Sequence, residues 1–414
     1  MKLLYICHRI PYPPNKGEKI RSYNILRYLA KRHEVYLAYL VDEPHDMEHL
    51  ETLRSMVQGV YFDTIHNLTK KIRSGLTMLG SKPISVSYFY SQNLQRSIDN
   101  LLRKVEIDTI FCSSSPTAEY LFSFQRYNGK LRRSKWIMDL IDVDSHKWRQ
   151  YAGKCKGVKR WVYLREAKSL RRYEKRIAKE FDRLLLVSEA ERDLFLQNIS
   201  ADNVFVMSNG VDLEYFSPGY DSRIVKTGRS LVFTGAMHYR PNIEGVEWFV
   251  EKVLPKIQKS IPDVTFYVVG NRPSPAVRRL AKKKGVKVTG YVEDVRDFLA
   301  AADVCVVPLR IARGIQNKVL EAMAMAKAVV CTPQALEGIK AVPGRDVLVE
   351  YGDEGFAASV IRLLTDHAFL ERTGHLARQC VEEGYAWDAN LSQLERMITP
   401  LEPSKQELRV GGLI

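Results

Sequence analysis

Short apolar runs alternate with longer segments of helical periodicity along the whole chain. In the first half, the apolar runs have the length of buried strands, and most are followed by a segment long enough for a helix. The predicted strands of this half are 3–7, 35–40, 60–65, 109–113, 136–141, 183–187 and 204–207. Strands that alternate with helices favour right-handed βαβ units, and therefore a parallel sheet.

The second half repeats this alternation. Its predicted strands are 231–235, 265–269, 286–289, 304–308, 329–331 and 347–350. Its predicted helices are 242–260, 275–284, 295–301, 316–325 and 354–365, followed by a last helix at 387–397. A second parallel sheet is therefore expected.

These patterns predict an α/β protein with two Rossmann-like, doubly wound domains that face each other across a cleft. A length of 414 residues suits two domains. The predicted parts are an N-terminal domain (1–207), a linker (208–228), a C-terminal domain (229–385), a last helix (386–399) and a tail (400–414). Ligands of open parallel sheets bind outside the carboxyl ends of the strands, so residues just after strands are the functional candidates.

Composition and charge narrow the class of protein. Hydrophobic residues make up 45% and charged residues 27% of the chain, as in globular proteins. The six cysteines form no CxxC pair, which indicates reduced core residues and no metal site. Neither a signal peptide nor an apolar run of about 20 residues is present. We therefore expect a cytoplasmic protein with reduced cysteines that is soluble or peripheral on the inner face of the cytoplasmic membrane.

One stretch combines the features of a phosphate-binding site. A buried strand ends at Pro308, a loop containing Gly314 follows, and a helix begins near Gln316. Free amides at a helix N-terminus attract phosphate, and glycine lets a ligand approach the backbone closely. Lys318 places a positive charge in the first turn, where it disfavours the helix unless an anion binds. Glu321 lies on the same face and suits ribose hydroxyls, although a surface Lys–Glu pair is the alternative.

Around this stretch the sequence resembles the retaining glycosyltransferases of family 4, over nearly the whole chain. The motifs that carry the resemblance, in order, are 208–212 (SNGVD), 216–218 (FSP), 233–237 (FTGAM), 290–294 (GYVED), 301–303 (AAD), 318–324 (KVLEAMA), 328–332 (AVVCT) and 337–338 (EG). The segments 13–21 (PPNKGEKIR) and 142–148 (DVDSHKW) are similar to the sugar transferases encoded with exosortase (PEP-CTERM) exopolysaccharide systems. The resemblance implies the GT-B architecture. In this architecture the domain 1–207 is expected to bind the acceptor, the domain 229–385 to bind the nucleotide sugar, and the helix 386–399 to pack back on the N-terminal domain.

The resemblance also implies roles for individual residues. Glu321 matches the carboxylate that binds the donor ribose, and Lys318 matches the basic residue on the diphosphate. Gly314 lies in the loop under the phosphates, and the turn that ends at Asp294 lies where the family holds the base. Gly17 matches the N-lobe glycine loop that closes over the sugar phosphate. The implied donor is a UDP- or GDP-linked sugar that acts as co-substrate, with no further cofactor.

Two positions depart from the family pattern. Arg313 stands seven residues before Glu321, where the family commonly has a second glutamate that orients the donor sugar. Either Arg313 adds a phosphate contact or it has no such role. The arginine that the family often places after the glycine of the first C-lobe strand is missing, because Ala236 follows that strand. Arg240 is a possible substitute, and an exposed loop arginine is the alternative.

A cluster of polar residues surrounds the end of the fifth predicted strand. Asp139, Asp142, Asp144 and His146 crowd the region where the family often has a histidine near the reacting sugar. We expect Asp142 to line the acceptor site, whereas Asp144 suits a helix cap. His8 ends the first strand and points at the same cleft, or else is a structural histidine.

The net charge of +15 implies an anionic partner, and much of it lies in one segment. Residues 154–183 hold 12 basic and 4 acidic side chains. A long helix at 157–183 is predicted, with one apolar face made by Tyr163, Ala167, Leu170, Tyr173, Ile177 and Phe181. This helix either meets an anionic membrane surface or is an ordinary helix with a solvated basic face. Nucleic acid is not expected as a partner, because no zinc finger, RRM signature or basic tail is present.

These features predict a retaining hexosyltransferase. It would move a sugar from a nucleotide-diphosphate donor to a lipid-linked or polysaccharide acceptor, without a metal ion, since basic side chains can stabilise the leaving diphosphate. Catalytic roles fall on Asp142, Lys318 and Glu321, and donor contacts on Gly17, Arg240, Asp294, Arg313 and Gly314 as well. A nucleotide-sugar epimerase and a catalytically silent scaffold of the same architecture remain the alternatives.

Overall fold

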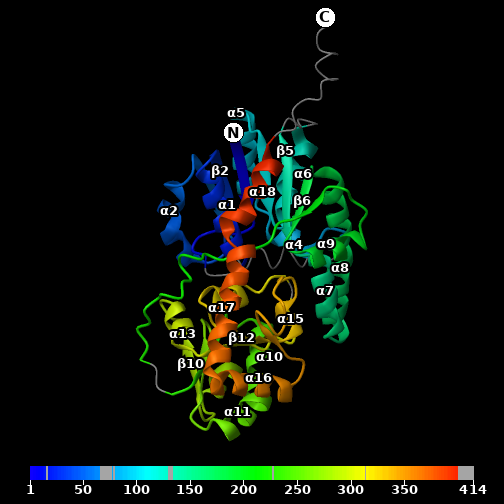
Figure 1. The fold of residues 1–414 in the computed structure, drawn as a ribbon. Coiled ribbons are helices and arrows are strands. Elements are labelled where there is room, and N and C mark those ends of the chain that lie inside the picture. Colours follow the sequence, from blue (N-terminus) through cyan, green and yellow to red (C-terminus); the bar gives the residue numbers. More distant parts are fainter. Residues whose placement is uncertain are drawn as a thin grey trace, which may run out of the picture. The chain divides into compact units, whose positions relative to one another are not determined.

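The computed structural model describes residues 1–14, 17–65, 77, 80–128, 134–225, 228–312 and 314–399 (Figure 1). The chain divides into two compact units. The first contains Met1–Met207 together with the chain from Leu391 onward, and the second contains Ser208–Asn390. The division falls within the helix α18 (Trp387–Ile398).

The first unit is built on a parallel sheet of seven strands in the order β3-β2-β1-β4-β5-β6-β7. Its strands are β1 (Lys2–Cys7), β2 (Glu34–Val41), β3 (Gly59–Thr64), β4 (Thr109–Ser113), β5 (Lys135–Ile141), β6 (Arg183–Leu186) and β7 (Val204–Val206). All seven were predicted to within one residue at each end. The strand order reverses at β1 and β4, which makes the carboxyl ends of these two strands the switch point of the sheet.

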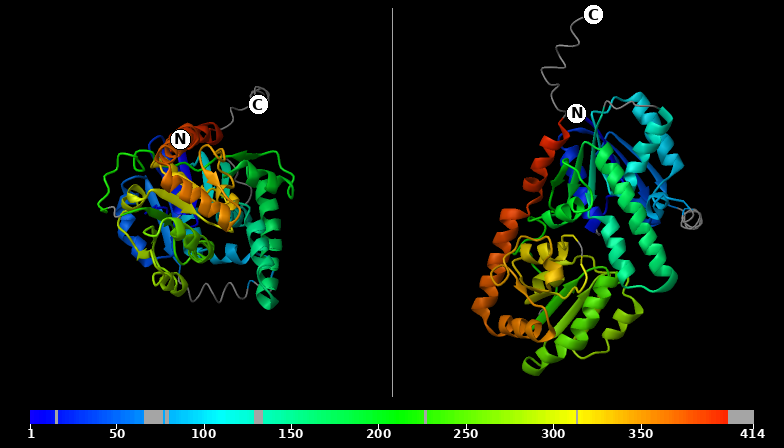
Figure 2. Two further views of the ribbon diagram at one scale, coloured as in Figure 1. Left: turned by 60° about the horizontal axis from the view of Figure 1, so that its bottom comes forward. Right: turned by 90° about the vertical axis from the view of Figure 1, so that its right-hand side faces the viewer.

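Helices accompany these strands in the alternation that the sequence predicts (Figures 1 and 2). They are α1 (Gly17–Ala30), η1 (Pro44–His49), α2 (Leu50–Arg54), α4 (Ile84–Tyr88), α5 (Gln92–Lys104), η2 (Ser115–Thr117), α6 (Ala118–Asn128), α7 (Asp144–Gly153), α8 (Gly157–Glu180) and α9 (Glu189–Leu196). The long basic helix α8 was predicted. Its apolar face is buried at Leu170, Tyr173 and Ile177, whereas Tyr163 is half-buried.

The C-terminal part of α18 belongs to the core of the first unit. Leu394 and Ile398 are fully buried there. The hydroxyl of Thr109, at the start of β4, donates a hydrogen bond of 2.9 Å to the carbonyl oxygen of Ile398. His33 lies 3.2 Å from the carboxylate of Glu395. The first unit therefore includes a segment from the far end of the chain.

A buried ion pair joins α1 to the sheet of the first unit. Arg21 on α1 contacts the carboxylate of Asp139 on β5 through two nitrogens, at 2.7 and 2.9 Å. Both side chains are almost completely inaccessible. A bidentate pair of this kind joins α1 to the sheet with a defined geometry. Asp139, which lies within β5, is therefore a structural residue.

The second unit contains a parallel sheet of six strands in the order β10-β9-β8-β11-β12-β13. The strands are β8 (Ser230–Thr234), β9 (Thr265–Val269), β10 (Val286–Gly290), β11 (Val304–Val307), β12 (Ala328–Cys331) and β13 (Leu348–Val349). These too match the predicted strands to within one residue. The order reverses at β8 and β11, so the switch point of this sheet lies at their carboxyl ends.

The helices of the second unit include one that the sequence patterns missed. They are α10 (Arg240–Trp248), a π-helical turn η3 (Phe249–Val253), α11 (Leu254–Ser260), α12 (Pro275–Leu280), α13 (Arg296–Ala301), α14 (Asn317–Ala324), α15 (Pro333–Leu336), α16 (Asp353–Thr365) and α17 (His367–Gly384). The missed helix α17 packs against α14 and β12. Its buried positions include the small residues Thr373, Gly374 and Ala377, so its apolar periodicity is weak.

The cysteines fit a reduced protein. All six are free, and Cys7, Cys112, Cys305 and Cys331 are buried in strands. Cys155 and Cys380 are only partly buried, and therefore are not core residues as predicted.

We predict that Asp139→Ala destabilises the first unit strongly. The substitution leaves the Arg21 guanidinium buried without a counter-charge, which should lower the free energy of unfolding by about 3–5 kcal/mol. Urea denaturation with hydrogen exchange at β1 and β4 measures this loss. The matched control is Glu51→Ala, which breaks the exposed Arg54–Glu51 pair and should cost less than about 1 kcal/mol. Equal losses in the two variants would contradict the assignment.

Candidate functional site

The switch point of the second sheet brings together several residues that the sequence analysis selected. Gly235 follows β8, the loop containing Gly314 follows β11, and α14 begins at Asn317. Lys318 and Glu321 both lie on α14, close to its N-terminus. Ligands of doubly wound sheets bind at this place, outside the carboxyl ends of the strands.

Lys318 is partly buried and has no carboxylate partner within ion-pair distance in the described part of the chain. Its Nζ donates a hydrogen bond of 2.8 Å to Oδ1 of Asn242 and lies 4.7 Å from the centre of the Phe233 ring. Burial lowers the pKa of Lys318 to about 8, although the charge of Glu321 opposes the shift. A cation held in this way is poised to accept an anionic ligand.

The pKa of Glu321 is shifted in the opposite direction to that of Lys318. Burial raises its pKa to about 7, and the charge of Lys318 opposes this shift. A solvent-exposed Lys–Glu pair would show neither shift, because water would screen both charges. The burial of both groups therefore argues against the surface pair that the sequence left open.

Glycines bring the backbone close together beside Lys318. Gly270, after β9, has a φ of +149°, and a Cβ atom there would lie 1.7 Å from the carbonyl oxygen of Gly235. Gly235 has a φ of +154°, and a Cβ atom there would lie 3.0 Å from Nζ of Lys318. Both positions require glycine, so neither Gly235 nor Gly270 places a side chain beside Lys318.

The N-terminus of α14 presents backbone amides on the same side. The residue before the helix, Gln316, makes no side-chain cap hydrogen bond to it. Gly314 is buried and has a φ of +61°, a conformation that favours glycine. These features match a phosphate-binding loop and helix. Arg313, the predicted additional phosphate contact, lies outside the described residues.

Asn242 is a site residue that the sequence analysis missed. It is buried near the start of α10, accepts the hydrogen bond of Lys318 and donates one of 2.9 Å to the carbonyl oxygen of Ala236. It thereby positions Lys318 against the turn after β8. The sequence did contain a signal for this role. A strand is followed by a glycine and then by a helix, and a polar residue lies near the start of that helix. Such a residue also suits a helix N-terminus, which hid its role.

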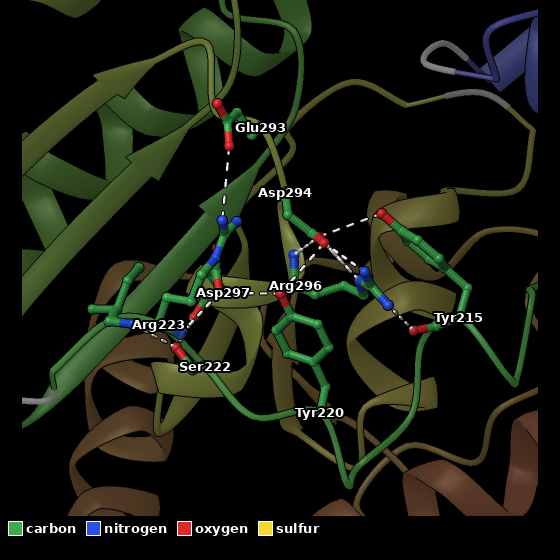
Figure 3. A network of polar contacts seen from close by, with 9 residues as sticks. Tyr215, Tyr220, Ser222, Arg223, Glu293, Asp294, Arg296 and Asp297 are labelled. Atoms are coloured by element: carbon green, nitrogen blue, oxygen red, sulfur yellow. Dashed lines mark hydrogen bonds and ion pairs between the residues drawn. The ribbon is translucent and has the colours of Figure 1, made fainter.

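Arg240 and Asp294 have other contacts in this structure. Arg240 begins α10, is exposed, and has its Nε 2.6 Å from Oε1 of Glu244. The carboxylate of Asp294 takes hydrogen bonds from Arg296 and from the hydroxyl of Tyr215 (Figure 3). These interactions hold the Asp294 side chain in place. Burial alone would raise the pKa of Asp294, but the hydrogen bonds and charge of Arg296 keep it below its usual value.

The same network attaches the segment after Ser208 to α13. Arg223 donates two side-chain hydrogen bonds to Asp297, at 2.9 and 2.6 Å, and the hydroxyl of Tyr220 donates a third at 3.1 Å (Figure 3). Ser222 donates to the carbonyl oxygen of Asp297 at 2.8 Å. The described part of this segment is therefore a structured part of the second unit.

The first sheet places Asp142 at its carboxyl edge through an unusual backbone. Ile141 has a φ of +70°, which is rare for a β-branched residue, and the register between β5 and β6 shifts there. Oδ1 of Asp142 is inaccessible to solvent and has no hydrogen-bond partner in the described part of the chain. Desolvation raises the pKa of Asp142. Strain beside an unpartnered carboxylate marks this turn as a functional candidate.

The neighbours of Asp142 have different roles. Asp144 is not the cap of α7 as expected, because Val143 occupies that position. Glu174 of α8 binds the amide and the hydroxyl of Ser145 instead, at 2.9 and 2.5 Å. Asp144 accepts a hydrogen bond of 2.9 Å from Ser115.

The first turn after β1 adds further polar groups. His8 is buried, packs edge-on against Phe89 at 5.1 Å and has no partner for Nδ1 among the described residues. Burial lowers the pKa of His8. Next to it, Arg9 pairs with Glu18 on α1 and, at 2.8 Å, with Asp42. Gly17, the predicted glycine-loop residue, is exposed and begins α1.

One part of the chain matches a known protein family. Residues 228–366, within the second unit, match the family described as "Glycosyl transferases group 1". The residues matched include both Lys318 and Glu321.

Across its length the chain is similar to one curated relative and to several solved structures. An uncharacterized 44.6 kDa protein in the cps region of Klebsiella pneumoniae is 22% identical over 394 residues, covering 93% of this chain and 96% of that one. Sucrose-phosphate synthase of Thermosynechococcus elongatus is 16% identical, with a TM-score of 0.69 over 96% of this chain and 98% of that chain. HepE of Anabaena, solved with UDP, is 15% identical, with a TM-score of 0.68 over 97% and 100%. The two units thus have the GT-B fold.

Two further properties concern the described residues alone. No helix among them is long and apolar enough to cross a membrane. No three of their His, Cys, Asp or Glu side chains form a group suited to a metal ion. Independence from metal stays a prediction.

We predict that Gly270→Ala disrupts this edge of the second unit. The new Cβ would clash with the carbonyl oxygen of Gly235, so the free energy of unfolding should fall by more than about 2 kcal/mol. Urea denaturation measures the loss. Gly384→Ala is the control, because a Cβ atom at this helical position meets nothing within 4 Å, and it should change stability by less than about 1 kcal/mol. A Gly270→Ala protein as stable as this control would refute the close approach.

Proposed function

We propose that the protein is a retaining hexosyltransferase that moves a sugar from a UDP- or GDP-linked donor to a lipid-linked or polysaccharide acceptor in the synthesis of a cell-surface polysaccharide. The observation that carries the proposal is the partly buried Lys318 beside the N-terminus of α14, inside the segment that matches the group 1 family.

The names of similar proteins agree with this substrate class. HepE of Anabaena was solved with UDP, with UDP and glucose, and with UDP-glucose. The Klebsiella relative is named for a cps region, which supports a place in polysaccharide synthesis. We extend both to this chain as parts of the proposal.

The leaving diphosphate would bind in front of Lys318. Gly235 and Gly270 leave the backbone bare there, and the amides of α14 supply hydrogen-bond donors. A bound diphosphate favours the charged form of Lys318 and raises its pKa from about 8. Negative charge that develops on the diphosphate as the glycosidic bond breaks is then stabilised by a group already in place.

The nucleoside would extend toward Glu321 and the end of β10. As a carboxylate, Glu321 accepts hydrogen bonds from the two ribose hydroxyls. The Asp294 side chain is already held by Arg296 and Tyr215, so the backbone of the turn before it, rather than its carboxylate, would contact the base.

Retention of configuration requires no protein nucleophile in this scheme. The acceptor hydroxyl attacks the anomeric carbon from the face that the diphosphate leaves, and a diphosphate oxygen takes the acceptor proton. The protein positions both substrates and stabilises the departing charge. We assign Asp142 to the acceptor, because its side chain lies at the carboxyl edge of the first sheet, directly after the strained backbone of Ile141.

A lipid-linked acceptor would require the protein to reach a membrane surface. The basic segment 154–183 supplies the positive charge for such contact, and the described residues contain no membrane-crossing helix. We therefore propose a cytoplasmic protein that is peripheral on the inner membrane face.

We predict that Lys318→Ala and Glu321→Gln impair transfer. Loss of a group that stabilises the leaving diphosphate typically reduces the rate by about 10²–10³-fold, so Lys318→Ala should fall in this range. Calorimetry with UDP- and GDP-sugars identifies the donor, and NMR of the product reports the anomeric configuration. The control is Lys283→Gln, which changes an exposed lysine elsewhere in the second unit.

Three outcomes would contradict this proposal. Absence of binding by any sugar nucleotide would favour a silent scaffold. Conversion of the donor to an epimer without an acceptor would show the epimerase instead. A product of inverted configuration would exclude retention.

We predict that donor affinity depends on pH with a maximum between about 7 and 8. Lys318 loses its proton, and with it the attraction for diphosphate, as pH rises through about 8. Glu321 gains a proton, and loses acceptor capacity for ribose, as pH falls through about 7. Calorimetry across this range should show both limbs, and Glu321→Gln should abolish the acidic limb while it keeps the alkaline one. A flat profile in the unsubstituted protein would be inconsistent with these roles.

A further inference from the structure

The helices α7 and α8 form an antiparallel hairpin whose tip carries an unusual surface. α7 ends at Gly153, α8 begins at Gly157, and the two helices pack together (Figures 1 and 2). Figure 1 shows the hairpin extending past the carboxyl ends of β5 and β6. The tip consists of the connection between the helices and the first two turns of α8.

Three large apolar side chains are exposed at this tip. They follow each other at three-residue steps on α8: Val158 is 78% exposed, Trp161 57% and Leu164 43%. Side chains at this spacing lie on one side of a helix. They are separate from the buried face of α8, which includes Leu170 and Ile177. The sequence pattern predicted only the buried face.

The charge around these side chains has one sign. No aspartate or glutamate occurs between Asp144 and Glu166. Four exposed basic residues flank the apolar positions, and none of them forms an ion pair with a described residue: Lys154, Lys156, Lys159 and Arg160. Unpaired cations beside an exposed tryptophan indicate a partner that is both anionic and apolar.

The hairpin holds this surface rigidly. Trp148 and Tyr151 of α7 pack with Tyr163 of α8, with ring centres 5.1 to 6.4 Å apart. Glu174 of α8 binds the first turn of α7, and Glu166 binds the amides of Ile84 and Ser85 at 2.7 and 2.9 Å. The apolar tip is therefore presented by packed helices.

We propose that the tip of the α7–α8 hairpin docks on an anionic lipid bilayer, with Val158, Trp161 and Leu164 entering the headgroup boundary and the surrounding lysines and Arg160 contacting lipid phosphates. Tryptophan favours this boundary, where its ring is apolar and its N–H can reach a polar group. An anionic bilayer offers an apolar environment to the three apolar side chains and lipid phosphates to the cations.

Other occupants fit these observations less well. A second copy of the chain would bring two basic tips together, and like charges repel. A nucleic acid would satisfy the cations but would leave Val158 and Leu164 without an apolar partner. This inference rests on the membrane contact given under the proposed function and identifies the surface that makes it. Docking on a bilayer would bring the protein close to a lipid-linked acceptor. Docking itself requires neither donor nor acceptor.

The test measures binding of the full chain to vesicles by sedimentation. Vesicles of equal parts phosphatidylglycerol and phosphatidylcholine are compared with pure phosphatidylcholine at low salt. The anionic vesicles should bind the protein, and Trp161→Glu should reduce the partition coefficient by about tenfold or more. Lys156→Gln and Lys159→Gln should each reduce it by about fivefold.

Matched controls separate this surface from general charge and hydrophobicity. Tyr351→Glu removes an aromatic side chain that is 88% exposed in the second unit, and Lys282→Gln with Lys283→Gln removes two exposed lysines there. Neither control should change binding by more than about twofold. Brominated lipid should quench the tryptophan fluorescence of the protein, and Trp161→Phe should remove that quenching while it preserves binding.

Several results would overturn the proposal. These are equal binding to neutral and anionic vesicles, unchanged binding of Trp161→Glu, and a Trp161-dependent dimer in place of vesicle binding. Transfer to a soluble acceptor by Trp161→Glu should equal that of the unsubstituted protein. Failure of the transferase would appear as lost donor binding with intact vesicle binding, so the two proposals fail separately.

Discussion

The candidate site depends on Lys318, which is partly buried and has no carboxylate within ion-pair distance among the described residues. Burial lowers its pKa to about 8, and its hydrogen bond goes to the neutral Asn242. The charge can therefore be satisfied by a ligand. Gly235 and Gly270 add no side chains beside the ammonium. Together these constraints make this place a candidate anion site.

In the first unit, by contrast, a buried charge is neutralised by another side chain. The buried Arg21–Asp139 pair is complete, so it defines how α1 lies on the sheet and is not available to a ligand. Asp142 lies three residues after Asp139 and directly after Ile141, whose backbone is left-handed. Its Oδ1 has no hydrogen-bond partner among the described residues. The contrast separates a structural carboxylate from a candidate functional one, although both belong to the same acidic cluster in the sequence.

The success and failure of the sequence predictions have physical causes. Strands of parallel sheets are buried on both faces, so they appear as continuous apolar runs that need no long-range information. The helix α17 was missed because Gly374 packs against the backbone of Ala326, where a Cβ atom would lie 2.2 Å from its carbonyl oxygen. Such a face is made of small residues and produces little periodicity. Asn242 was missed because its partner, Lys318, is 76 residues away.

By itself, the sequence determined the alternation of strands and helices, the concentration of positive charge in 154–183 and the proximity of Lys318 and Glu321 on one helix. These are local properties, set by periodicity and by spacing of a few residues. Only the tertiary structure decided that Lys318 is held by Asn242, that Asp139 is used by Arg21, and that Trp161 remains exposed at a helical tip. Burial and partner choice depend on residues distant in sequence, which no local pattern contains.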